Sequence, residues 1–186
     1  MREIILASAS PRRRELLSLS PLPFTIEPAK GTEPPVDPTL SPEENVLRLA
    51  ALKAEEVAAR HPEALVIGCD TVVAVDGDIL GKPIDEEDAA RMLRALSGRE
   101  HAVYTGVCLL SPEGGERFCE RTAVRFRSLS AQEIAWYVST GEPLDKAGAY
   151  GIQERAAMFI EGIDGDYANV VGLPLCRLMQ ALSSMI

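Results

Sequence analysis

Signals for the start of a helix recur along this chain, and apolar runs typical of buried strands lie between them. Ser10-Pro11 and Ser41-Pro42 each place a capping hydroxyl before a proline at the first helical position. Ser41 and Ser130 are also followed three residues later by glutamate, which is the pattern of a capping box. Because helical patterns alternate with apolar runs such as 3–8 and 102–110, the sequence predicts a mixed α/β fold.

The same signals give approximate bounds for each element. Helices are expected from Ser10 to about residue 19, from Ser41 to about residue 60, over 85–97 and 130–141, and from Pro174 onward. Strands are expected at 3–8, 65–67, 72–75, 102–110, 117–126 and near 158–160, with Asp76-Gly77 as a hairpin turn. The proline-rich stretch 21–42 is expected to be a surface loop or lid.

Composition narrows the class of protein. With 186 residues, 46% of them hydrophobic, the chain can bury a core without disulfides or metals, so a single domain over 1–186 is expected. The formal charge of −9 argues against nucleic-acid binding, because such proteins neutralise phosphates with clustered cations. No apolar stretch approaches the ~20 residues of a membrane span, and the N-terminal apolar run is too short for a secretion signal. A soluble cytoplasmic protein is expected.

The side chains that most often bind zinc give no zinc-binding pattern here. The four cysteines are widely spaced without a C-x-x-C pair: Cys69, Cys108, Cys119 and Cys176. Because three of them lie within apolar runs, they are expected to be reduced thiols in the core. His61 and His101 share no local pattern with a nucleophile or a second ligand, so no catalytic role is expected of them.

The segment Ser8-Ala9-Ser10-Pro11-Arg12-Arg13 leads from a strand into a helix and presents consecutive arginines. Backbone N–H groups at a helix N-terminus, hydroxyls and guanidinium groups can together bind an anion such as phosphate. The alternative is an ordinary capped helix with solvated arginines. The segment is not a Walker A loop, because the glycines and the Gly-Lys-Ser/Thr ending are absent.

Asp70 lies in the segment Gly68-Cys69-Asp70-Thr71, at the carboxyl end of an apolar strand, where open α/β sheets place their ligand sites. A carboxylate there can hold a divalent cation or act as general base on a water. The alternative is a turn aspartate that accepts hydrogen bonds from nearby backbone N–H groups.

Three further residues are candidates for contact with a ligand. Lys82 lies between Gly81 and Pro83, which would aim it at a phosphate, and Lys53 flanks the apolar stripe of its helix. For both lysines the alternative is a solvated side chain, which for Lys53 means lying along the helix surface. Gln153 ends a glycine-rich run and could pair with the edge of a nucleobase, the alternative being a set of tight turns.

Along the whole chain, these segments resemble the motifs of the Maf family in order and spacing. The matching segments are 6–13, 48–54, 68–71, 81–83, 96–98 with 101 and 104–107, 141–153, and 165–167 with 169–174. The resemblance implies a distorted mixed β-sheet flanked by helices, in two lobes with a central cleft, similar to the inosine triphosphate pyrophosphatases. It also implies a metal-dependent enzyme that hydrolyses nucleoside triphosphates to the monophosphate and pyrophosphate, and a homodimer as a family-level expectation.

The resemblance also assigns roles to individual residues. Asp70 matches the family's proton acceptor, and it shares with Glu33 the expected Mg²⁺ or Mn²⁺. The positions that line the family's phosphate and metal site are matched by Ser8, Arg13, Glu33, Lys53 and Lys82. The branch of the family that acts on dTTP and UTP is matched at three specificity positions: Arg12, Thr71 and Gln153. The branch that acts on 7-methyl-GTP typically differs at all three.

This chain departs from the family pattern in a few places. Glu154 stands where many members have glycine, and Cys69 where alanine is common. The sequence around Glu33 is a looser match than the other segments.

The expected reaction uses Asp70 to orient or deprotonate the attacking water. Three cations, Arg13, Lys53 and Lys82, are expected to neutralise the charge that builds on the leaving pyrophosphate. Arg12 is expected to help choose the base instead. Two alternatives are a nucleotide-binding regulator of septum formation without turnover, and a pyrophosphatase for a modified nucleotide. Pyrophosphate release from a panel of triphosphates, with and without metal, separates these readings.

Overall fold

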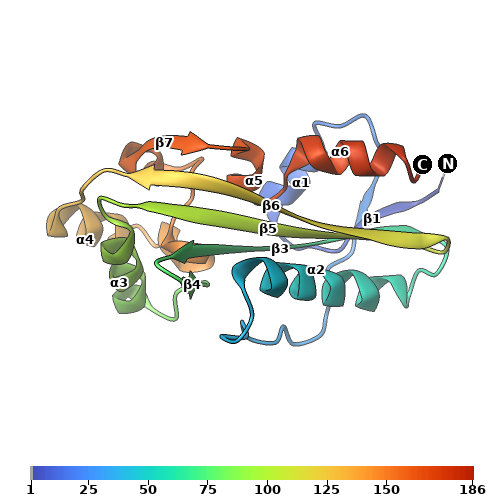
Figure 1. Cartoon of the computed structure of the whole chain (residues 1–186), viewed down its shortest axis with the longest axis horizontal. Coiled ribbons are helices and arrows are strands. Elements are labelled where there is room, and N and C mark those ends of the chain that lie inside the picture. Colours follow the sequence, from blue (N-terminus) through green and yellow to red (C-terminus); the bar gives the residue numbers. More distant parts are fainter. Residues whose placement is uncertain (1) are drawn as a thin grey trace. The chain divides into compact units, whose positions relative to one another are not determined.

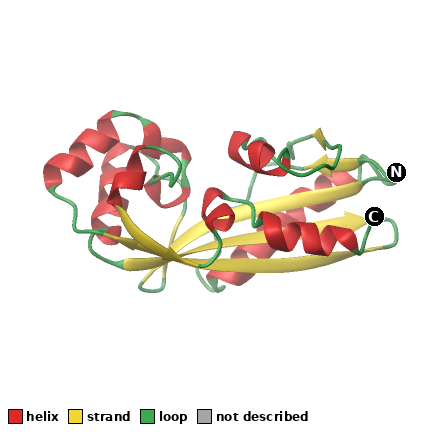
Figure 2. Cartoon of the chain, turned by 90° about the horizontal axis from the view of Figure 1, so that it is seen from above, coloured by secondary structure: helices red, strands yellow, loops and turns green. Residues whose placement is uncertain are grey.

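The computed structural model describes residues 2–186, in which helices and strands are interspersed along the chain (Figures 1 and 2). The strands are β1 (Ile4–Leu6), β2 (Thr25–Ile26), β3 (Leu65–Val75), β4 (Asp78–Leu80), β5 (Glu100–Ser111), β6 (Gly114–Phe126) and β7 (Ile160–Asp164). The α-helices are α1 (Pro11–Leu17), α2 (Pro42–Ala58), α3 (Glu86–Leu96), α4 (Ala131–Ser139), α5 (Tyr167–Val171) and α6 (Leu175–Ser183). Short 3₁₀ helices are η1 (Glu142–Asp145), η2 (Ala147–Ala149) and η3 (Arg155–Phe159). Within these described residues, no helix combines the length and apolarity needed to cross a membrane.

The strands form one mixed sheet in the order β2-β1-β3-β5-β6-β7, with β4 paired to β3. β1 is parallel to both of its neighbours, so that Ile5 lies opposite Thr25 of β2 and Val66 of β3. β4 is antiparallel to β3, and β7 is antiparallel to β6. A mixed sheet flanked by helices is the fold class that the sequence predicts.

The chain divides into two compact units. Unit 1 comprises the chain up to Thr71 together with Thr105–Glu120 and Gly172–Ile186. Unit 2 comprises Val72–Tyr104 and Arg121–Val171. The strands β3, β5 and β6 therefore contribute residues to both units, and each unit has a core of its own.

In unit 1, helix α2 begins as its capping box predicts. Glu44 N–H donates to Ser41 Oγ (3.2 Å), and Ser41 N–H donates to the Glu44 carboxylate (2.8 Å). Ala50 and Ala54 belong to the buried face of α2 and share one core cluster with Ile5 of β1. Small side chains on this face let the helix backbone come close to the sheet.

The strand expected at 65–67 does not end at Gly68. Instead β3 continues to Val75, so Gly68, Cys69, Asp70 and Thr71 are strand residues and not a turn. A Cβ at Gly68 would lie 2.2 Å from Ala50 O, which means that glycine is needed for the close approach of α2. The predicted break was wrong because a glycine in a strand pattern can mark a backbone contact as well as a turn.

In unit 2, buried aromatic rings fill the core between β5, β6 and the short helices. Phe126 contacts the rings of Tyr150 and Phe159, and Phe159 also contacts Tyr137. Tyr137 is fully buried in this core, whereas its neighbour Trp136 on α4 is 46% exposed. The last strand, expected near 158–160, begins at Ile160 because a 3₁₀ helix occupies the preceding residues.

All four cysteines are free thiols, as expected. Cys69 and Cys108 are buried, and burial raises the pKa of Cys69 to about 11, so this thiol stays protonated at neutral pH. Cys176 is exposed on α6, so its expected place in the core was wrong.

Candidate active site

The register of β1 against β3 brings Ser8 to the middle part of β3. Leu6 pairs with Ile67, and Ala7 N–H donates to Ile67 O (2.8 Å), so the chain still follows β3 when it reaches Ser8. Ser8 is buried, and its Oγ accepts the N–H of Ser10 (3.2 Å). Ser10 in turn caps α1, as predicted, by accepting the N–H of Arg13 (3.5 Å). The turn that was expected to bind an anion is therefore fixed by its own hydroxyls.

The guanidinium of Arg13 joins three separate segments of unit 1. Its Nε donates to Gly172 O (2.8 Å), and its Nη2 donates to Thr71 Oγ1 (3.0 Å). Its Nη1 donates to Ser8 Oγ (3.2 Å) and to Cys69 O (3.1 Å). Four of the five N–H groups of a guanidinium thus have acceptors within the protein. The predicted contact of Arg13 with triphosphate stays a prediction, and the geometry gives this side chain a structural task as well.

Asp70 faces the lysine that the sequence places on the flank of α2. Lys53 Nζ lies 2.6 Å from Asp70 Oδ1 and 2.9 Å from Glu33 Oε2. Asp70 is 6% exposed, whereas the Glu33 side chain is 54% exposed. One ammonium therefore lies between a buried and an exposed carboxylate. This arrangement decides against a solvated Lys53 and against Asp70 as a turn residue.

The electrostatics of Asp70 suit a general base. Burial raises the pKa of Asp70 above its ordinary value, and the charges of Lys53 and Arg13 partly offset that rise. Glu33 acts in the same direction as burial, because a second negative charge disfavours ionisation. A carboxylate with a raised pKa holds an abstracted proton more firmly than a solvated one does.

The loop that carries Glu33 is fastened on both sides, although its sequence matches the family less closely. On one side, the carboxylate of Glu56 accepts the N–H groups of Lys30 (2.7 Å) and Gly31 (2.9 Å). On the other, the buried Asn45 exchanges two hydrogen bonds with the backbone of Asp37. The expected surface loop is thus anchored to α2, which brings Glu33 to Lys53.

The remaining predicted residues lie in other surroundings. Arg12 is half-buried on α1, and the Thr71 hydroxyl is 2.9 Å from that of the buried Thr105. Lys82 and Gln153 belong to unit 2, where both side chains are exposed. Lys82 follows β4, and Gln153 lies in a turn before η3.

Two contributors were missed at the level of sequence. Thr105 and Gly172 lie in segments that match the family, but nothing in their residue types gave them a role. Thr105 acts through a hydroxyl that contacts Thr71, and Gly172 through a backbone carbonyl that accepts from Arg13. A backbone acceptor leaves no trace in residue identity, so only the tertiary contact reveals it.

Comparison with known proteins identifies the family. Residues 3–185 match the profile described as "Maf-like protein". The chain belongs to the Maf family. Among curated Maf relatives, "dTTP/UTP pyrophosphatase" of Geobacillus sp. (strain WCH70) is 53% identical over 185 residues, covering 100% of this chain and 99% of that protein. The protein of the same name from Bacillus velezensis (strain DSM 23117 / BGSC 10A6 / LMG 26770 / FZB42) is 52% identical and covers 97% of this chain and 95% of its own length.

Solved structures support the fold of this Maf chain. A HAM1 protein from Coxiella burnetii matches with a TM-score of 0.52, covering 99% of this chain and 100% of that one at 17% identity. The Staphylococcus aureus Ham1 protein matches with a TM-score of 0.53, covering 99% of both chains, also at 17% identity. At this identity the likeness concerns the fold alone.

Proposed function

We propose that this chain hydrolyses dTTP and UTP between the α and β phosphates, releasing the monophosphate and pyrophosphate. The observation that carries the proposal is the Lys53 ammonium between the buried Asp70 and the exposed Glu33. A general base, a cation for phosphate oxygens and a second carboxylate are thereby assembled at one place. The name shared by relatives that match 97–100% of this chain supports the substrate class.

A divalent cation, Mg²⁺ or Mn²⁺, is part of the proposal. Asp70 and Glu33 already share one cation, the Lys53 ammonium, so their oxygens fit a site for a hard metal ion. Among residues 2–186 no cluster of three or more metal-binding side chains occurs, and Mg²⁺ commonly takes only one or two carboxylates besides water and phosphate oxygens. When bound, the ion would polarise the phosphates and partly neutralise their charge.

The chain's own residues supply the rest of the chemistry. Asp70 takes the proton of the attacking water, which its raised pKa favours. Lys53 exchanges its exposed partner Glu33 for a phosphate oxygen when the triphosphate binds, and Lys82 adds a second ammonium. Arg13 joins β3 to the segment before α6, because it donates to the carbonyl oxygens of Cys69 and Gly172.

Choice of the base is assigned to Gln153, together with Arg12 and Thr71. A carboxamide offers both a donor and an acceptor, which suits the O4 and N3–H of uracil or thymine. This activity belongs to the cytoplasm, where removal of unwanted triphosphates protects the nucleotide pool.

Replacing Asp70 by Asn tests the assignment, because Asn keeps the size of the side chain but cannot accept the proton. Pyrophosphate release from UTP and dTTP should fall by about 10²–10⁴-fold, while nucleotide binding by calorimetry stays measurable. The matched control is Asp78→Asn, at an exposed carboxylate on β4. Near-normal turnover in Asp70→Asn contradicts the assignment of the base.

A panel of triphosphates tests the reaction itself. Wild-type protein should release pyrophosphate from UTP and dTTP faster than from CTP and GTP. Chelation with EDTA should abolish the release, and added Mg²⁺ or Mn²⁺ should restore it. Binding of these nucleotides without any turnover would identify a regulator instead, and turnover confined to modified nucleotides would change the substrate.

A further inference from the structure

The turn that presents Gln153 is closed by its own backbone. Glu154 N–H donates to Gly151 O (3.2 Å), which makes Gly151–Glu154 a four-residue turn with Gln153 in third place. The Gln153 side chain is exposed, so a bound base can reach it. The Gln153 side chain keeps one orientation toward a base only if both ends of this turn are held in place.

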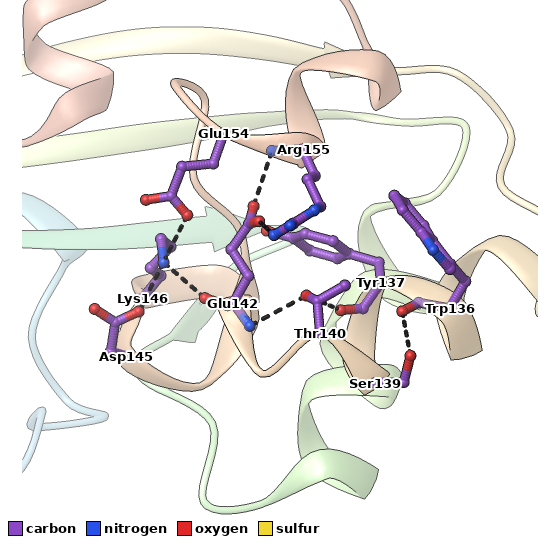
Figure 3. Close-up of polar contacts among 9 residues, drawn as sticks. All are labelled: Trp136, Tyr137, Ser139, Thr140, Glu142, Asp145, Lys146, Glu154 and Arg155. Atoms are coloured by element: carbon purple, nitrogen blue, oxygen red, sulfur yellow. Dashed lines mark hydrogen bonds and ion pairs between the residues drawn. The ribbon is translucent and has the colours of Figure 1, made fainter.

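A buried lysine holds one end of this turn. Lys146 is 6% exposed, and its ammonium lies 3.1 Å from Glu154 Oε2. Figure 3 draws this ion pair. The same Nζ donates to Glu142 O (2.7 Å) and to Asp145 Oδ1 (2.7 Å). An ammonium has three N–H donors, and here each of them has an acceptor. Lys146 therefore has no spare donor for a ligand, in contrast to an ordinary loop lysine.

The stem of Lys146 also supports the start of the turn. A Cβ added at Gly151 would lie 2.7 Å from Lys146 Cε and 2.9 Å from Lys146 Cδ. Gly151 thus rests directly on the lysine side chain, and a larger residue would displace it. One side chain thereby contacts both the first and the last residue of the turn.

The residue after the turn is held by a second carboxylate. The Glu142 side chain is 6% exposed, and it accepts the backbone N–H of Arg155 (3.0 Å) as well as Arg155 Nη1 (2.8 Å) (Figure 3). Glu142 N–H in turn donates to Thr140 Oγ1 (3.2 Å) at the end of α4. Lys146 and Glu142 together fix the backbone on both sides of Gln153.

We propose that Lys146 and Glu154 are positioning residues that hold Gln153 in the orientation needed to select the base. The inference rests on the proposed function, in which Gln153 contacts a uracil or thymine. A side chain on a fixed turn loses less entropy when it forms its hydrogen bonds, so the correct base gains more from them. Glu154 gives this turn an ion pair with Lys146 that a glycine at this position could not form.

The decisive measurement is kcat/KM for UTP relative to CTP. Lys146→Met removes the ammonium but keeps an unbranched stem beneath Gly151, and should lower this ratio about tenfold, the value of one well-formed hydrogen bond. Glu154→Gln keeps an acceptor but loses the charge, and should lower the ratio about threefold. Activity toward CTP should change less than twofold in both variants. A purely structural defect would instead lower kcat/KM for UTP and for CTP by the same factor.

A double-mutant cycle with Gln153→Ala completes the test. Lys146→Met should have no further effect on the ratio once Gln153 is absent, because the lysine acts through it. The control is Arg99→Met, which removes an exposed cation paired with Asp76 and should leave the ratio unchanged.

The outcomes separate the two proposals. If Gln153→Ala lowers the ratio but neither Lys146→Met nor Glu154→Gln does, the positioning role is wrong and the role of Gln153 stands. If Gln153→Ala leaves the ratio unchanged, base selection by Gln153 is wrong, and the positioning role falls with it. Should Lys146→Met fail to fold, Glu154→Gln decides alone, because it keeps the buried ammonium.

Discussion

Replacing Arg13 by Lys should destabilise the protein, because the lysine keeps the charge but loses the planar fork. Arg13 donates to two backbone carbonyls, Gly172 O and Cys69 O, and to two hydroxyls. The hydroxyls keep other partners, since Ser8 Oγ accepts from Ser10 N–H and Thr71 Oγ1 contacts Thr105 Oγ1. The loss therefore falls mainly on the two carbonyls.

The size of the effect follows from those two bonds. A hydrogen bond to a charged group contributes about 1.5–3 kcal/mol, so two contribute roughly 3–6 kcal/mol. A lysine at position 13 can restore one of them as a point donor, which leaves a loss of about 1.5–3 kcal/mol in the free energy of unfolding. Arg13→Met restores neither and should lose about 3–6 kcal/mol, a large share of the roughly 5–15 kcal/mol typical of a domain.

Urea unfolding followed by circular dichroism measures the change, with unchanged m-values as the sign that both states keep their compactness. Arg14→Met is the matched control, because Arg14 is the exposed neighbour on the same helix, and it should change stability by less than about 0.5 kcal/mol. Suppose Arg13→Lys loses less than about 1 kcal/mol while KM for dTTP rises tenfold or more. The side chain would then be a phosphate ligand first, and the structural role would be refuted.

Two further predictions concern the cores of the two units. His101 is buried with its Nε2 2.8 Å from Tyr150 Oη, and burial lowers its pKa to about 4. Below pH 6.5, His101 is protonated in the unfolded chain but stays neutral in the folded one. The free energy of unfolding should therefore fall by up to about 1.4 kcal/mol per pH unit between pH 6.5 and 4. Urea midpoints at pH 7, 6 and 5 should show this slope reduced in His101→Gln; an identical slope would contradict it. Gly68→Ala should destabilise by about 1–3 kcal/mol or more, because the new methyl would lie 2.2 Å from Ala50 O; a variant as stable as wild type in thermal melts would show that α2 can move away.

Local signals predicted five of the six α-helices of residues 2–186, because the interactions that start most of them are local, and missed the short α5. The capping boxes at Ser41 and Ser130 form as expected, since each joins residues three apart in the sequence. The break expected at Gly68 failed for the opposite reason. Whether a glycine marks a turn or a close contact depends on α2, a partner that local reasoning does not include.

The same distinction applies to the site. Asp70 and Lys53 could be chosen as site residues from residue type and resemblance, because the chemistry of a carboxylate and of an ammonium follows from the residue type. The hydrogen bonds of Arg13 could not be predicted in this way, because two of its acceptors are backbone carbonyls. The burial of Lys146 was also missed, since a lysine in a glycine-rich run is ordinarily expected to be exposed.

Lys53 and Lys146 both bind carboxylates, yet their surroundings prepare them for different tasks. Lys53 is held by two carboxylates, one of them on the 54% exposed Glu33, so an incoming phosphate can replace that partner without leaving a buried charge unpaired. Lys146 has a backbone carbonyl among its three acceptors and a side chain only 7% exposed, so releasing it would leave buried groups unsatisfied. The first lysine is therefore suited to meet a substrate, and the second to hold the turn that carries Gln153. The number and exposure of the acceptors, more than the residue type, distinguish a lysine that binds substrate from one that positions a turn.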